Sequence, residues 1–196
     1  MPDLMELFDE LDLSVASMNS GAGEWPSNLY DVIVIDPPWE IEKVASKLLH
    51  VGRNQKKELD YPVMSLADIT DLKIKEISMP NSVCFLWTIQ KYLRDSFNIL
   101  ESWGFKPTVT MTWNKCKGLS LFGIGYINEF ILFGYRGKLE LFPSRSVMPS
   151  VLTYSSTGHS IKPQEFYDHA EAFGEERIDI FARQPRPGWD IWGNEV

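Results

Sequence analysis

The chain has 196 residues, 44% of them hydrophobic and 23% charged, which suits one globular domain with a buried core. Its formal net charge of −8 excludes binding of a polyanion through overall charge, so a nucleic-acid ligand would require local basic patches. No apolar run approaches the roughly 20 residues that span a bilayer, which predicts a protein without a membrane partner.

The N-terminal stretch is acidic and lacks the basic region with which a signal peptide begins. Its acids within residues 1–13, which contain no Lys or Arg, are Asp3, Glu6, Asp9, Glu10 and Asp12. We expect residues 1–20 to form an acidic tail or helix and residues 21–196 to form the main domain. Cys84 and Cys116 have no metal-ligand spacing and are too few for a disulfide scaffold. They indicate reduced thiols in a cytoplasmic protein without a bound metal.

The first strong element is the apolar, β-branched run VIVI at 32–35, which predicts a strand buried on both faces. The motif DPPW follows it directly, at 36–39. A polar stretch comes next, and its basic residues are Lys43, Lys47, Arg53, Lys56 and Lys57. Ser65 as N-cap and Asp68 in the capping-box position then predict a helix over 66–77.

The rest of the chain alternates between apolar β-type runs and helical patterns. Strands are predicted at 82–88, 107–113, 129–135, 151–154 and 177–183. Helices are predicted at 90–103, ending at Gly104, and from Pro163 to Phe173, ending at Gly174. The glycine-rich LFGIGY at 121–126 precedes a strand and not a helix, so we expect a flexible loop there instead of a phosphate-binding loop.

This order of strands and helices predicts an α/β fold with a mostly parallel sheet and antiparallel additions near 107–135. In such sheets, ligands bind beyond the carboxyl ends of the strands. Asp36 directly follows the strand at 32–35. It is therefore expected at the ligand-binding edge of the sheet.

The DPPW motif carries the groups that can activate the amine of a flat aromatic base. The lone pair of such an amine is delocalised into the ring, so each amine hydrogen needs an acceptor that draws the nitrogen toward a pyramidal geometry. The Asp36 carboxylate can accept from one hydrogen. The Pro37 carbonyl, which has no rival helical or sheet use because of Pro38, can accept from the other. Trp39 would offer a flat face on which the base stacks. The alternative is a turn that simply ends a strand.

Further motifs follow DPPW in a distinctive order: YPVMSLADI, FLWT, TWNK, GYINEFILFGYRGK, HSIKPQEFY and IDIFARQPRPGWDIWGNE. With these motifs over residues 31–196, the chain resembles the DPPW-type adenine-N6 methyltransferases. That family includes the catalytic subunit of the messenger-RNA adenosine methyltransferase and its prokaryotic and phage relatives. The resemblance implies a Rossmann-like methyltransferase fold with a permuted motif order and S-adenosyl-L-methionine as cofactor. It also implies methylation of adenine N6 in nucleic acid, with DNA favoured because the compact chain is similar to prokaryotic and phage members.

The resemblance extends to individual cofactor-binding residues. It implies that Lys162 meets the methionine carboxylate of the cofactor and that Arg183 lies near the ribose. Asn194 and Glu195 would bond ribose hydroxyls, and Asp36 would contact the cofactor as well as the base.

Three further stretches are less informative. Trp189 and Trp192 are expected in the core or in a wall of the site, and not stacked on a base. SMNSGAG at 17–23, the stretch that should hold the cofactor's adenine, shows no clear acidic pattern. Asn-Glu at 128–129 stands where His-Glu is more usual, which can alter substrate preference.

The basic residues of 41–62 follow the catalytic motif, so we expect them to contact substrate phosphates; a solvated loop is the alternative. His159 is a further candidate for substrate binding, although such a histidine is more often an ordinary loop residue. Two alternative functions also stay open: methylation of RNA, and a catalytically inactive nucleic-acid-binding partner subunit with the same fold. The resemblance does not decide whether the protein forms a homo- or hetero-oligomer.

Overall fold

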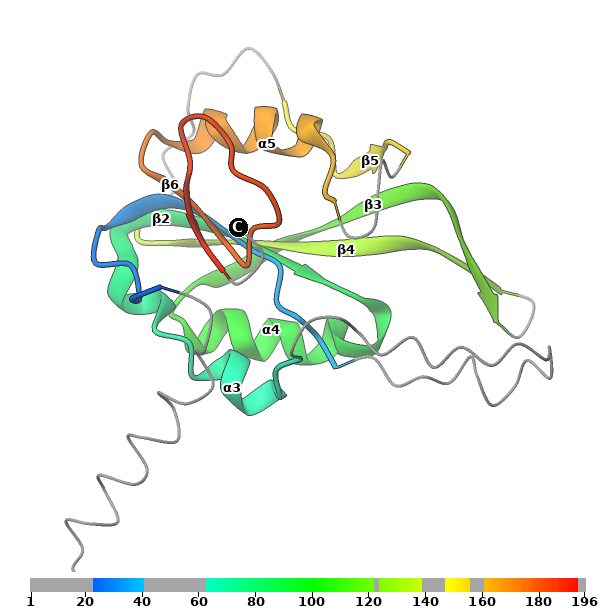
Figure 1. Cartoon of the computed structure of the whole chain (residues 1–196), viewed down its shortest axis with the longest axis horizontal. Helices are drawn as coiled ribbons and strands as arrows, with labels where there is room; N and C mark the ends of the chain where they lie inside the picture. Colours follow the sequence, from blue (N-terminus) through cyan, green and yellow to red (C-terminus); the bar gives the residue numbers. More distant parts are fainter. Residues whose placement is uncertain (1–22, 41–62, 122–123, 139–146, 156–160, 194–196) are drawn as a thin grey trace, which may run out of the picture.

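The computed structural model describes residues 23–40, 63–121, 124–138, 147–155 and 161–193. Within them, seven strands form one sheet in the order β5-β3-β4-β2-β1-β6-β7 (Figure 1). The strands are β1 (Tyr30–Ile35), β2 (Ser78–Thr88), β3 (Lys106–Leu121), β4 (Ile124–Arg136), β5 (Val151–Thr153), β6 (Arg177–Ile180) and β7 (Asp190–Trp192). Strand β4 is antiparallel to β2 and β3, and the other pairs are parallel. The mostly parallel α/β sheet with an antiparallel addition is therefore confirmed.

Helices cover both faces of this sheet (Figure 1). Helices α3 (Leu66–Thr70) and α4 (Leu93–Ser102) lie on one face, and α5 (Gln164–Ala170) lies on the other. Short 3-10 helices occupy Ile74–Ile77, Gln90–Tyr92 and Glu171–Phe173. Among the described residues, no helix combines the length and apolar character needed to cross a membrane.

The central strand β1 is buried on both faces. Its Ile33 and Ile35 share a core with Leu100 of α4, whereas Val34 belongs to a second core with Phe166 of α5. This two-sided burial explains why residues 32–35 are apolar without alternation. The apolar run ends together with the strand, which leaves Asp36 at the carboxyl edge of the sheet.

Two helices differ in detail from their prediction. The capping box of Ser65 and Asp68 is present, but α3 ends at Thr70 and a separate 3-10 helix occupies Ile74–Ile77. Pro163 is the N-cap of α5 and not its first residue. The predicted single helix over 66–77 is therefore wrong in its second half.

The strand predictions need three corrections. Strand β6 ends at Ile180 because Phe181 has a φ of 65°, a left-handed conformation that breaks the strand. Strand β7 was not predicted, since three residues are too few to show a periodicity. The loop expected at 121–126 is also wrong in most of its length: β3 continues to Leu121 and β4 begins at Ile124, so Gly125 belongs to a strand of a long hairpin.

Candidate active site

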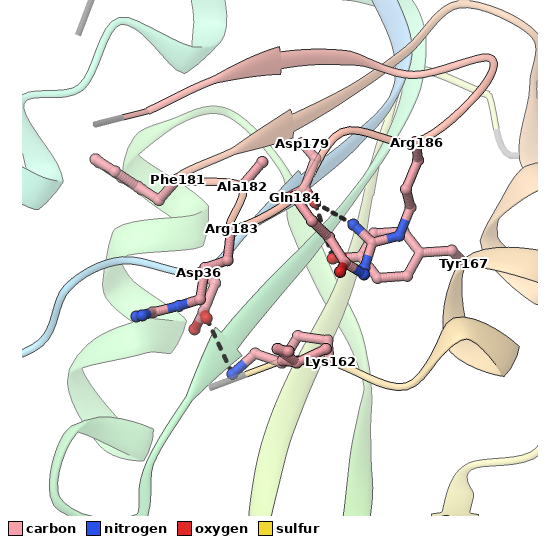
Figure 2. Close-up of a pocket in the computed structure, with 10 residues that line it drawn as sticks. Asp36, Lys162, Tyr167, Asp179, Phe181, Ala182, Arg183, Gln184 and Arg186 are labelled. Atoms are coloured by element: carbon pink, nitrogen blue, oxygen red, sulfur yellow. Dashed lines mark hydrogen bonds and ion pairs between the residues drawn. The ribbon is translucent and has the colours of Figure 1, made fainter. Parts of the chain in front are cut away.

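A cavity lies at the carboxyl edge of the sheet, where β1 and β6 end and α5 begins (Figure 2). Its polar lining includes Asp36, Lys162, Tyr167, Asp179, Arg183 and Arg186. Asp36 follows β1, Lys162 precedes α5, and Arg183 lies on the loop after β6. The structure therefore brings together three of the residues selected from the sequence.

Lys162 connects two carboxylates at this edge. Its Nζ lies 3.0 Å from Oδ2 of Asp36 and 2.9 Å from Oε2 of Glu129 in β4. The other oxygen of Glu129, Oε1, lies 3.1 Å from Nζ of Lys115 in β3. The ammonium of Lys162 also lies 4.7 Å from the centre of the Trp87 ring. Four alternating charges thus run from the hairpin to the carboxylate of DPPW.

Burial and these neighbours shift the pKa values of the three central groups. Burial disfavours the charged form of Lys162, but Asp36 and Glu129 outweigh it and raise the pKa of Lys162 above its ordinary value. Burial also opposes ionisation of Glu129, yet Lys162 and Lys115 bring the pKa of Glu129 below its ordinary value. For Asp36, burial outweighs the attraction of Lys162, and its pKa is raised. The cluster therefore pairs a charged lysine with a carboxylate of increased basicity.

The two prolines of DPPW hold their backbone in defined contacts. The carbonyl of Pro37 accepts a hydrogen bond from the Trp39 N–H at 2.8 Å, and the carbonyl of Pro38 accepts one from the Met64 N–H at 3.0 Å. The bond from Trp39 is a turn contact within DPPW, and not a helical or sheet use of the Pro37 carbonyl. A carbonyl oxygen has two lone pairs, so one acceptor site remains at Pro37 for a ligand.

Trp39 does not present a free face. Its side chain is 5% exposed, and its ring stacks on Tyr92 with 5.0 Å between centroids. The indole N–H donates to the Trp87 carbonyl at 3.1 Å, and the Tyr92 hydroxyl donates to the Glu40 carbonyl at 2.6 Å. The predicted role of Trp39 as a stacking platform for the base is corrected, because the ring is buried and fastens the DPPW segment to β2.

A second buried cluster borders the same cavity, and sequence reasoning missed it. Asp179 of β6 accepts hydrogen bonds from the Tyr167 hydroxyl at 2.9 Å and from Nη1 of Arg186 at 3.2 Å. The Arg186 guanidinium carbon lies 3.5 Å from the centre of the Tyr167 ring (Figure 2). Burial raises the pKa of Asp179 to about 7. The cluster ties α5 and the loop after β6 to the sheet.

That loop is packed closely against the end of β7. Arg183 had been expected at the end of a strand over 177–183. It lies three residues beyond Ile180, the last residue of β6, and therefore belongs to the loop. A Cβ added to Gly193 would lie 2.9 Å from Cα of Phe181, which leaves room for glycine alone. Trp189 and Trp192 are 7% and 6% exposed, so their expected place in the core is confirmed.

The sequence matches the family described as MT-A70 over residues 30–195. The chain belongs to the MT-A70 family. This confirms the resemblance drawn from DPPW and the later motifs, and with it the Rossmann-like methyltransferase fold.

Three relatives illustrate the range of proteins that the chain is similar to. The type II methyltransferase M.MunI of Mycoplasma sp is 26% identical over 186 residues, which cover 87% of this chain and 79% of the relative. The human N(6)-adenine-specific methyltransferase METTL4 is 28% identical over 188 residues, 85% of this chain but 37% of the relative. The N6-adenosine-methyltransferase non-catalytic subunit MTB of Arabidopsis thaliana is 31% identical over 87 residues, 44% of this chain and 10% of the relative.

The cavity chemistry of this MT-A70 chain fits the amino-acid end of S-adenosylmethionine. A carboxylate, Asp36, suits an α-ammonium group, the ammonium of Lys162 suits an α-carboxylate, and the guanidinium of Arg183 beside them can donate to the neighbouring ribose. All three line one cavity at the ligand-binding edge of the sheet. The residues present are therefore compatible with this cofactor.

Several expected site residues lie outside the described part of the chain. They are Lys43, Lys47, Arg53, Lys56, Lys57, His159, Asn194 and Glu195. Residues 1–20, expected to be an acidic tail or helix, also lie outside it. Their expected roles stay predictions from the sequence. By contrast, Glu129 and Lys115 lie within the described residues. Their roles could not be deduced from the sequence because they depend on an ion pair between β3 and β4.

Proposed function

We propose that this MT-A70 chain is an S-adenosylmethionine-dependent methyltransferase that modifies the N6 amine of adenine in DNA. The observation that carries the proposal is the position of Asp36, fixed by Lys162 at the carboxyl edge of β1 beside a cavity suited to the cofactor. The adenine specificity is supported by family membership and by the printed name of METTL4.

The chain's own groups can prepare the amine for transfer. Asp36 Oδ1 and the remaining lone pair of the Pro37 carbonyl accept the two amine hydrogens, which draws the nitrogen lone pair out of the ring. S-adenosylmethionine supplies the methyl group when bound. The methylated amine must lose one proton, and Asp36 Oδ1 accepts it, because burial increases the basicity of this carboxylate.

Lys162 has two tasks in this scheme. It holds Oδ2 of Asp36 at 3.0 Å, which orients Oδ1 toward the amine, and it faces the cavity where the methionine carboxylate would bind. Arg183, Asn194 and Glu195 are proposed to contact the ribose. Glu129 keeps Lys162 in place from the opposite side at 2.9 Å.

DNA is favoured over RNA because M.MunI, named a type II methyltransferase, is covered over 79% of its length. Methylation of RNA is the second candidate. A non-catalytic subunit is disfavoured because the chain keeps all four residues of DPPW and their fixed geometry. We further propose a cytoplasmic location and substrate phosphate contacts from Lys43, Lys47, Arg53, Lys56 and Lys57.

Methyl transfer from labelled S-adenosylmethionine to single-stranded DNA, duplex DNA and RNA, compared side by side, tests the proposal. Nucleoside analysis should place the label on N6 of adenine, with DNA the best substrate. A better rate on RNA would select the second candidate, and no transfer to any of the three would reject the enzymatic assignment.

A further inference from the structure

The hairpin of β3 and β4 extends past the catalytic edge of the sheet (Figure 1). Strand β2 ends at Thr88, opposite Phe130 of β4, and the pairing of β3 with β5 ends at Asn114. Within the described residues, the hairpin segments beyond these points pair with each other and with no further strand. We name residues 115–121 and 124–128 the arm. Because β2 ends on the same edge as β1, the arm projects from the edge that carries Asp36.

The arm presents large apolar side chains to solvent. Ile124, Tyr126 and Ile127 are 64%, 41% and 40% exposed. Strand alternation places Ile124 and Tyr126 on the face of the hairpin that Leu132 shares with α4 farther along β4. Side chains of this kind contribute little to a hairpin that covers no core, so their exposure points to a ligand.

The charge of this region suits a polyanion. Over residues 115–128, which include the arm, the sequence contains Lys115 and Lys117 and no Asp or Glu, although the whole chain carries −8. The first acid after this stretch, Glu129, is paired with Lys115 and Lys162. An acid-free segment next to the catalytic carboxylate therefore departs from the charge of the rest of the protein.

The base of the arm joins the candidate active site directly. Lys115 is the first residue of the arm, and its Nζ lies 3.1 Å from Oε1 of Glu129. Glu129 in turn contacts the Lys162 ammonium that holds Asp36. A ligand lying along the arm therefore ends beside the group assigned to the target amine. Nucleotides that flank a target base must lie in this position, directly beside the site of methyl transfer.

We propose that the arm binds the DNA strand flanking the target adenine, with Tyr126 and Ile124 packed against unstacked bases. This inference rests on the proposed function and specifies where its substrate is held. Base stacking on an aromatic side chain is tolerant of sequence, which suits contacts outside the target position. It also supplies an aromatic surface for bases that the buried Trp39 does not offer.

The test compares Tyr126→Ala with Ile124→Ala, singly and combined, against Val109→Ala. Val109 is a matched control because it is an apolar residue of β3, 41% exposed, located where the hairpin lies within the sheet. Anisotropy of a fluorescein-labelled single-stranded DNA containing adenine gives the DNA affinity, and calorimetry gives the affinity for S-adenosylmethionine. The double variant should weaken DNA binding about 10-fold or more. Its cofactor affinity and all properties of Val109→Ala should match wild type.

A second readout separates the arm from the chemistry. The KM of the double variant should rise for the long oligonucleotide and stay unchanged for an adenine-containing dinucleotide, which is too short to reach the arm. Unchanged DNA affinity in the double variant overturns the inference. If the double variant also loses a self-association that sedimentation detects for wild type, the arm binds a second copy of the chain instead. Arm-dependent DNA binding by a wild-type protein that transfers no methyl group would keep the inference and reject the enzymatic assignment.

Discussion

Asp36 is held by an ammonium group and raised in basicity by burial, so one atom change tests its role. Asp36→Asn keeps the size of the side chain but removes the charge that Lys162 holds at 3.0 Å. Methyl transfer should fall about 10²- to 10³-fold, the usual cost of losing one preorganised group. Asp71→Asn, at the exposed C-cap of α3, is the control and should keep full activity. Equal rates for Asp36→Asn and wild type would remove this residue from the mechanism.

Lys115 acts on the same reaction through Glu129. Burial opposes ionisation of Glu129, and Lys162 with Lys115 keeps its pKa below the ordinary value. A carboxylate with a lowered pKa contributes its ion pairs at higher pH and loses them as the pH falls through that pKa. Lys115→Gln removes one of the two cations beside Glu129 and so raises the pKa of Glu129. The acidic limb of kcat/KM against pH should therefore move to higher pH. Lys115→Arg should restore it, and superimposed profiles for Lys115→Gln and wild type would contradict the link.

At the scale of elements, the DPPW segment is fastened to β2 and to the 3-10 helix before α4 by Trp39. The ring is 5% exposed, stacks on Tyr92 and donates to the Trp87 carbonyl. Trp39→Ala should lower the free energy of unfolding in urea by about 3–5 kcal/mol, as for other large core residues. Unchanged stability together with a raised KM for DNA would instead restore Trp39 as a base-stacking residue.

The link between β6 and α5 makes stability depend on pH. Folding raises the pKa of Asp179, chiefly through burial, from 3.8 to about 7, so the native state binds this proton more tightly than the unfolded chain. The resulting stabilisation is full below the ordinary pKa and is lost as the pH rises toward 7. Asp179→Asn removes this loss. When the pH is raised from 5 to 8, the free energy of unfolding of the variant relative to wild type should therefore increase by about 2–3 kcal/mol. Urea unfolding at both pH values measures this, with the exposed Asp168→Asn as control; a constant offset would contradict it.

The elements that sequence could predict are those with a local signal. The apolar run of β1, the capping box of α3 and the order of DPPW and Lys162 are readable because each depends on neighbours in the chain. Strand β7 was missed because it is stabilised by β6 and not by its own pattern. The long hairpin was mistaken for a loop because its glycines outweighed the strand signal, although β3 and β4 support each other across it. Asp179 was missed because its role depends on hydrogen bonds from Tyr167 and Arg186, and the spacing of these residues in the sequence does not indicate such contacts.

Over the whole molecule, an acidic protein must concentrate its few bases where a polyanion binds. Arg136 lies at the end of β4 that is opposite the arm, and its guanidinium donates to the Lys75 carbonyl near the amino end of β2. It therefore lies away from the edge that carries Asp36 and cannot contact substrate phosphates around the active site. A group of five bases that can serve this task lies in residues 41–62, which follow DPPW directly.

This distribution predicts a salt effect that depends on position and not on charge alone. Each phosphate contact contributes a slope of roughly 0.9 on duplex DNA or 0.7 on single strands to the salt dependence of binding. Lys56→Gln with Lys57→Gln should weaken DNA binding and flatten this slope by about one to two units, while leaving S-adenosylmethionine affinity unchanged. The charge-matched control is Lys73→Gln with Lys75→Gln, two exposed residues at the amino edge of β2, which should leave the slope as it is. If salt titrations of the two double variants overlay, the stretch after DPPW does not contact phosphates, and a partner subunit must supply them.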